Sequence, residues 1–207
     1  MCIALVKKPD GVVTKERLRE CWDRNRDGAG FAYVYKGNVI ISKGLMTFDE
    51  FYKAYSEAVA THPESVFLIH FRIATSGDKG KSNTHPFSVG DGTALIHNGI
   101  LFSPPNAKRS DTNIFSEWLS KRLPDKQTWL ANKEKVEELI GNYNKLALLF
   151  KDGTFLICNE MKGEWSNNVW YSNTYSFSSG TGWTGVSNNW HNRLQSLIHH
   201  QGNRSIN

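Results

Sequence analysis

The chain has 207 residues, a mass of 23.5 kDa and a hydrophobic fraction of 39%, which suits one globular domain with its own core and excludes disordered and fibrous proteins. Its formal net charge of +5 is spread along the chain with no basic helix or arginine stripe, so we expect no nucleic-acid partner. No apolar run reaches the about 18 residues of a membrane span, and the first, residues 2–6, is too short for a signal peptide. We therefore expect a cytoplasmic protein without a membrane partner.

Apolar or alternating runs predict eight strands. They are residues 2–7, 30–35, 38–42, 66–72, 93–97, 146–151, 154–159 and 169–172. Lys36-Gly37 and Asp152-Gly153 lie between neighbouring runs, where two-residue hairpin turns need a positive φ. Some of the strands are apolar without alternation, which indicates that both of their faces are covered. We therefore expect stacked sheets between helices.

Three stripes with helical spacing lie between these strands. The first, residues 48–59, opens with the capping-box pair Thr47 and Glu50. The second, 114–119, and the third, 136–140, end at proline and glycine signals. The aromatic residues in these stripes are interpreted as core.

The end of the chain differs in composition. After residue 177 it is rich in Ser, Asn, Gly and Trp, with weak periodicity. We therefore expect one domain over residues 1–177 and a C-terminal segment, 178–207, that is either a packed aromatic flap or a loose tail.

Cys2 is the candidate nucleophile. Removal of Met1 would expose an α-amine, whose reference pKa is about 7.7–8.0, beside the thiol, so the same residue would supply nucleophile and base. Taken alone, a cysteine that opens a strand is more often a small core residue. Together with Cys21 and Cys158 it lacks the spacing of a zinc site or a disulfide framework, so we expect no metal and no cofactor.

Several later segments each supply a group that an amide-cleaving cysteine needs. In chain order they are NRDGAGF at 25–31, HFRIATSG at 70–77, NTHPF at 83–87, IHNGI at 96–100 and SDT at 110–112. With the opening MCIA they resemble the class II glutamine amidotransferases, which are N-terminal-nucleophile hydrolases, from residue 2 to about 175. The segment 25–31 is most similar to stand-alone members, including some encoded by bacteriophages. The resemblance implies an α+β fold, a four-layer αββα sandwich of two mostly antiparallel sheets.

The resemblance also implies catalytic partners for Cys2. Asn98 and Gly99 match the family pair that stabilises the oxyanion, the first through its side-chain NH₂ and the second through its backbone N–H. An Asn-Gly pair after a strand is otherwise a common turn.

Four further residues are implied to bind substrate. Arg72, assisted by Thr75, would hold the α-carboxylate of glutamine, and Asp111 would receive its α-ammonium. His85 would support the glutamine pocket. The alternatives are a surface ion pair for Arg72 and helix N-capping for Asp111, by Asp111 itself or by its neighbour Ser110.

The sequence departs from the family pattern at Ile73 and Ser76, where many members have Trp and His. The stretch 76–84 has the composition of a mobile lid or of an ordinary surface loop. His70 and His97 lie in strand-like segments and are interpreted as interior histidines.

The expected activity is hydrolysis of the glutamine side-chain amide to glutamate and ammonia. The chain has no room for an ammonia-accepting domain, so ammonia would pass to a separate synthase or to no acceptor. Two alternatives are an amidohydrolase that cleaves a γ-glutamyl or related amide without transfer, and a non-catalytic binding protein that uses its Trp-rich C-terminal segment.

Overall fold

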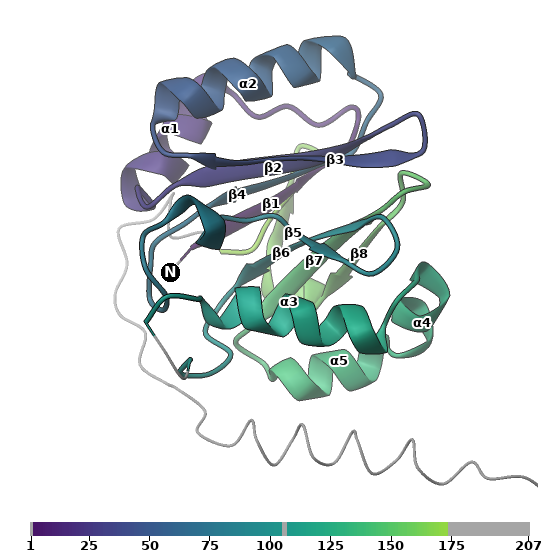
Figure 1. Ribbon diagram of the computed structural model, residues 1–207. Coiled ribbons are helices and arrows are strands. Elements are labelled where there is room, and N and C mark those ends of the chain that lie inside the picture. Colours follow the sequence, from purple (N-terminus) through teal and green to yellow (C-terminus); the bar gives the residue numbers. More distant parts are fainter. Residues whose placement is uncertain (1, 105–106, 174–207) are drawn as a thin grey trace, which may run out of the picture.

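Two antiparallel sheets lie face to face, with helices on the outer side of each (Figure 1). The computed structural model describes residues 2–104 and 107–173. The predicted C-terminal segment, 178–207, lies outside the described residues. The arrangement is mixed α/β and is compatible with the expected α+β sandwich.

The larger sheet has six strands in the order β3-β2-β4-β1-β10-β9. They are β1 (Ile3–Lys7), β2 (Ala29–Tyr35), β3 (Asn38–Leu45), β4 (Phe67–Phe71), β9 (Glu164–Ser166) and β10 (Val169–Tyr171). The helices α1 (Lys15–Arg24) and α2 (Phe48–Thr61) cover its outer face.

The smaller sheet has four strands in the order β5-β6-β7-β8. They are β5 (Phe87–Val89), β6 (Thr93–Asn98), β7 (Lys145–Phe150) and β8 (Phe155–Cys158). Three helices lie on its outer side, namely α3 (Asp111–Arg122), α4 (Lys126–Ala131) and α5 (Lys133–Ile140).

Both faces of the central strands are buried, as their unalternated apolar sequences predict. In β1, Ile3 and Leu5 pack toward α1 and α2, whereas Ala4 and Val6 pack between the sheets. The molecule therefore has three apolar layers, one on each outer side and one between the sheets. Side chains in the middle layer are on average smaller, with alanines from β1, β2, β6 and β7 among them.

Turns and caps follow the predictions with one difference. The Thr47 side chain and Glu50 form the expected capping box at the start of α2. Lys36 and Gly37 both have positive φ, 49° and 73°. Between β7 and β8, however, Gly153 has a positive φ of 84°, while the Asp152 carboxylate accepts the Thr154 N–H at 3.0 Å. That connection is a four-residue loop over 151–154, not the predicted two-residue turn.

The strands place the candidate residues at one end of the sandwich. Cys2 precedes β1 and Arg72 follows β4, and these antiparallel strands pair Ile3 with Phe71. Asn98 is the last residue of β6. Within the described residues, no helix is long and apolar enough to cross a membrane.

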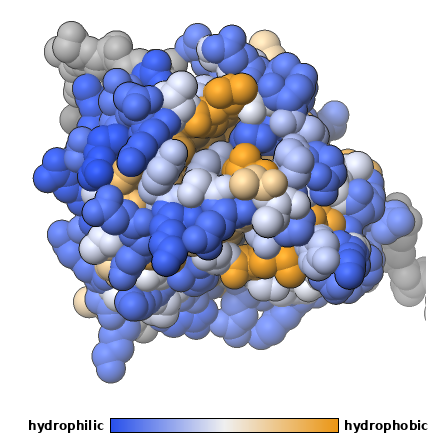
Figure 2. Space-filling model, turned by 90° about the horizontal axis from the view of Figure 1, so that it is seen from above, coloured by the Kyte–Doolittle hydropathy of each residue, from blue (hydrophilic) through white to orange (hydrophobic). Residues whose placement is uncertain are grey.

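The outer face over α1 and α2 is mainly hydrophilic (Figure 2), with groups of hydrophobic residues among the hydrophilic ones. A hollow of about 330 Å³ lies between the 9–13 segment and α2. A second, of about 440 Å³, is lined by Lys8, Trp165 and the β9–β10 turn. Lys7 lines the first hollow and Lys8 lines the second, so both hollows lie at the end of β1 that is far from Cys2.

Candidate active site

The Cys2 thiol lies against the backbone of Ile73. The thiol donates to the Ile73 carbonyl at 3.3 Å, and the Ile73 N–H lies 3.3 Å from Sγ. Burial raises the pKa of the thiol above its ordinary value, and the Ile73 N–H and the charge of Arg72 offset only part of that effect. The thiol is therefore protonated at neutral pH, and nucleophilic attack needs a base.

Arg72 is a buried cation, only 3% exposed. The turn at Asp27 and Gly28 holds the backbone of Arg72. The Arg72 N–H donates to the Gly28 carbonyl at 2.8 Å, and the Asp27 N–H donates to the Arg72 carbonyl at 2.9 Å. Its Nη2 donates to the Ser76 carbonyl at 2.9 Å. Its Nη1 is buried and has no partner among the described residues. A buried guanidinium nitrogen with free hydrogens favours an anionic partner.

Asp111 is buried beside it, 4% exposed. Ser110 is the N-cap of α3, because its hydroxyl accepts the Asn113 N–H at 3.2 Å. Asp111 Oδ1 accepts from the Ser76 hydroxyl at 3.0 Å, and Oδ2 accepts from the Leu101 N–H at 2.8 Å. Ser76 therefore joins Arg72, through its carbonyl, to Asp111, through its hydroxyl. A carboxylate oxygen can accept two hydrogen bonds, so Oδ2 has room for a second donor.

Asn98 and Gly99 form a tightly held turn. The Asn98 side chain is fully buried, and its Nδ2 donates to the Ser172 hydroxyl at 2.8 Å. Gly99 has a φ of +145°, and a Cβ there would lie 2.1 Å from Asn144 Oδ1. Only glycine fits this position without a shift.

His97 fixes the other side of the turn. Its Nε2 lies 2.8 Å from Asn144 Oδ1 and its Nδ1 lies 2.8 Å from the Thr112 hydroxyl. Because an amide oxygen only accepts, Nε2 carries the hydrogen when the ring is neutral, and Nδ1 accepts from Thr112. His97 is thus an interior histidine with both ring nitrogens paired, as predicted.

His85 belongs to a cluster of histidines between the sheets. Its ring centroid lies 3.9 Å from that of His70 and 6.5 Å from that of His97. Burial lowers the pKa of all three, that of His70 to about 3. His70 Nε2 donates to the His97 carbonyl at 2.9 Å, while both ring nitrogens of His85 are buried without a partner in the described part of the chain. These contacts place His85 in the interior beside the site residues.

Thr75 lies outside the contact network around Arg72. It is exposed, and Arg72 Nη2 donates instead to the carbonyl of the next residue, Ser76. Sequence reasoning singled out position 76 only as a departure from the family pattern. Its bridging contacts depend on the fold, so no local signal in the sequence could have found them.

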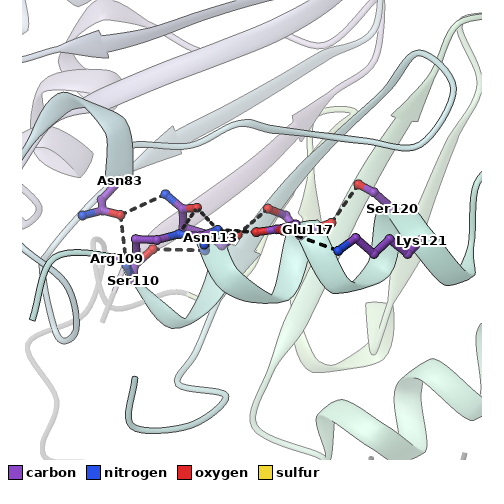
Figure 3. A network of polar contacts seen from close by, with 8 residues as sticks. Asn83, Arg109, Ser110, Asn113, Glu117, Ser120 and Lys121 are labelled. Atoms are coloured by element: carbon purple, nitrogen blue, oxygen red, sulfur yellow. Dashed lines mark hydrogen bonds and ion pairs between the residues drawn. The ribbon is translucent and has the colours of Figure 1, made fainter. Parts of the chain in front are cut away.

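Hydrogen bonds of Asn83 join the 76–84 stretch to the start of α3 (Figure 3). The buried Asn83 donates to the Lys108 carbonyl at 2.6 Å and accepts from the Ser110 N–H at 2.9 Å. An ion pair of 2.8 Å joins Lys79 to Asp27. These contacts join the stretch to the segment before α3 and to Asp27 in this structure.

The structure thus brings five of the seven predicted residues into a connected arrangement. Ile73 and Ser76 link Cys2, Arg72 and Asp111. Ser172, which sequence reasoning missed as a site residue, accepts from both Asn98 and the Ala4 N–H, and so links the Asn98-Gly99 turn to β1. Among residues 2–104 and 107–173, no group of three or more His, Cys, Asp or Glu is placed to hold a metal ion.

No family model matches the chain. A curated protein of Acanthamoeba polyphaga mimivirus, named as a probable glutamine–fructose-6-phosphate aminotransferase (isomerizing), is 27% identical over 147 residues. The match covers 63% of this chain and 24% of that protein, so the chain spans about a quarter of the relative's length. The chain therefore has a distant similarity to a protein named as a probable glutamine–fructose-6-phosphate aminotransferase.

Proposed function

We propose that this chain hydrolyses the side-chain amide of glutamine to glutamate and ammonia, with Cys2 as the nucleophile. The observation that carries the proposal is the bridge through Ser76, which joins a buried cation to a buried carboxylate. The cation, Arg72, directly precedes Ile73, whose backbone the Cys2 thiol contacts. The similarity to a protein named as a probable glutamine–fructose-6-phosphate aminotransferase supports the same substrate.

The two charged groups suit the two ends of a free amino acid. The unpartnered Nη1 of Arg72 would donate to the α-carboxylate, and the free position on Asp111 Oδ2 would accept from the α-ammonium. Both groups are buried, and Arg72 Nη1 has no partner among the described residues until such a ligand binds. This pairing selects an α-amino acid and leaves its side chain to face the thiol.

The chemistry needs a base for a thiol that is protonated at rest. Once Met1 is removed, the α-amine of Cys2 takes the thiol proton, and Sγ attacks the amide carbon. The tetrahedral intermediate collapses, the amine returns the proton to the leaving nitrogen, and ammonia departs. Water then attacks the γ-glutamyl thioester and releases glutamate and the thiol.

The oxyanion of each tetrahedral intermediate would accept hydrogen bonds from Asn98 Nδ2 and the Gly99 N–H. The loss of one such donor typically slows an enzyme about 10²- to 10³-fold. The observed order of layers, two antiparallel sheets between helices, is the one expected of an N-terminal-nucleophile hydrolase with this chemistry. The ammonia would be released or passed to a separate synthase.

Ammonia release from glutamine tests the proposal. The wild-type protein should release ammonia, Cys2→Ala should release none, and Cys158→Ala should keep the activity. Cys158 is the matched control because it is fully buried in the core of the smaller sheet and burial raises the pKa of its thiol to about 12.

Two other outcomes would replace the proposal. Turnover of a γ-glutamyl compound, but not of glutamine, would indicate an amidohydrolase. No turnover of either, together with a Met1 that mass spectrometry finds intact in the cellular protein, would indicate a binding protein that keeps the fold.

A further inference from the structure

One buried hydroxyl joins the strand of the candidate nucleophile to the candidate oxyanion donor. Ser172 follows β10 and is fully buried. Its hydroxyl oxygen accepts from the Ala4 N–H at 2.9 Å, two residues after Cys2, and from Asn98 Nδ2 at 2.8 Å. Its own N–H donates to the Ala4 carbonyl at 2.9 Å. Two hydrogen bonds to Ala4 therefore fix Ser172 to β1, and a third joins its hydroxyl to the Asn98 side chain.

The hydrogen bonds around this hydroxyl are incomplete. A serine hydroxyl has one hydrogen to donate and two lone pairs that accept, and both lone pairs are used here. Among the described residues its hydrogen has no acceptor, and Asn98 Oδ1 is buried with no donor. An unpaired donor and an unpaired acceptor thus lie on two groups that already touch, and each is costly when it is buried.

A half-turn of the Asn98 amide about its last side-chain bond removes both defects. The turn exchanges Oδ1 and Nδ2, so the Ser172 hydroxyl donates to Oδ1 and still accepts from Ala4. Of the polar atoms of these two side chains, and among the described residues, the amide nitrogen Nδ2 is then left unpaired, and it is a donor. A developing oxyanion is the acceptor that such a donor lacks.

We propose that Ser172 is a positioning residue for amide hydrolysis: its hydroxyl donates to Asn98 Oδ1 and leaves Nδ2 free to donate to the oxyanion that forms when Cys2 attacks. The inference rests on the proposed function. It explains why a residue outside every recognised motif is fully buried between the nucleophile's strand and the Asn98-Gly99 turn.

Steady-state kinetics with glutamine test this role. Ser172→Ala should lower kcat about 10- to 100-fold and change KM less than about threefold, because a misoriented donor weakens the transition state more than it weakens substrate binding. Ser172→Thr, which keeps the hydroxyl, should recover part of the loss. Alkylation of the Cys2 thiol by iodoacetamide should proceed at the wild-type rate in both variants. An unchanged kcat in a folded Ser172→Ala protein would overturn the proposal.

Ser65→Ala is the matched control. Ser65 is also buried and donates its hydroxyl to a backbone carbonyl, that of Val34, but it lies before β4, at the end of that strand away from Arg72. Its kcat should equal that of the wild type.

Neutron diffraction of wild-type crystals grown in D₂O decides the arrangement without any activity. A deuterium on the Ser172 oxygen that points to Asn98 supports the proposal, and an Asn98 amine deuterium that points to Ser172 overturns it. A wild type that does not hydrolyse glutamine would refute the proposed function, whereas the deuterium positions would still decide the orientation of Asn98.

Discussion

Mild acid should destabilise this protein through the histidines between its sheets. His70 is fully buried, and burial, together with the neighbouring charges of His97 and Arg72, lowers its pKa to about 3, although its hydrogen bond to the His97 carbonyl acts in the opposite direction. In the unfolded chain the pKa of a histidine is about 6.5. Between these two values the unfolded state binds a proton that the native state does not, so stability is full above pH 6.5 and falls as the pH decreases toward 3.

The size of the effect at pH 5 follows from the two pKa values. The unfolded-state pKa is about 6.5, and the native ring stays almost unprotonated at pH 5. Acidification to pH 5 therefore lowers the free energy of unfolding by about 2 kcal/mol. Burial lowers the pKa of His85 well below its ordinary value in the same way, so the total loss exceeds that of His70 alone. This is a large share of the about 5–15 kcal/mol that stabilises a typical domain.

Urea unfolding at pH 7 and pH 5 measures this loss, and His70→Gln assigns it. Glutamine keeps an N–H that can reach the His97 carbonyl but does not titrate, so the fall in unfolding free energy between the two pH values should be about 2 kcal/mol smaller in the variant. Val89→Ala, a buried substitution without a titrating group, should lower stability equally at both pH values. If His70→Gln loses as much stability as the wild type on acidification, His70 does not stay neutral in the native state and the reasoning is wrong.

Two further predictions concern the turns around the site. Gly99→Ala should lower the free energy of unfolding by about 2 kcal/mol or more, because the new Cβ would combine a positive φ with a contact of 2.1 Å to an amide oxygen. Gly37→Ala is the control, since Gly37 also has a positive φ but lies in open space, and it should cost less when both variants are compared by calorimetry. Equal losses would contradict the steric argument. Asp27→Asn should lower the free energy of unfolding at pH 6, and urea unfolding should show this loss shrinking as the pH falls below about 4. Although burial acts to raise it, the pKa of Asp27 is lowered by the Ala74 N–H and by Lys79, so the stabilisation by this carboxylate is full above its ordinary pKa and is lost as the pH falls through the native value. A loss that stays the same as the pH falls below about 4 would rule out this linkage.

The local signals in the sequence predicted most of the framework, because buried strands and capped helices have strong patterns. All eight predicted strands are present, with bounds that differ by at most a few residues. The helix α1 was missed although Thr14 caps it, because seven of its ten residues are charged and only three are buried. The strands β5 and β9 were missed because each has only three residues and lies at a sheet edge, which is too short for an alternating pattern to be recognised.

The candidate site was predictable only where a motif marks it. The sequence indicated Cys2, Arg72 and the Asn98-Gly99 pair as candidates because each belongs to a recognisable segment. It did not indicate Ser172, because the proposed role of this residue depends on contacts with Ala4, 168 residues earlier in the chain, and with Asn98, 74 residues earlier. Contacts of such separation leave no local periodicity or spacing in a single sequence.

Ser76 contacts the two charged groups of the candidate site through different parts of the residue. Its contact with Arg72 uses the backbone carbonyl, which every residue type offers, so this half of the bridge does not depend on the side chain. Its contact with Asp111 uses the hydroxyl, and only this half is specific to serine. A change of residue at position 76 therefore alters the surroundings of the carboxylate and leaves the guanidinium in place. The carboxylate is proposed to bind the ammonium end of the substrate, so variation at this position adjusts one end of the site independently of the other.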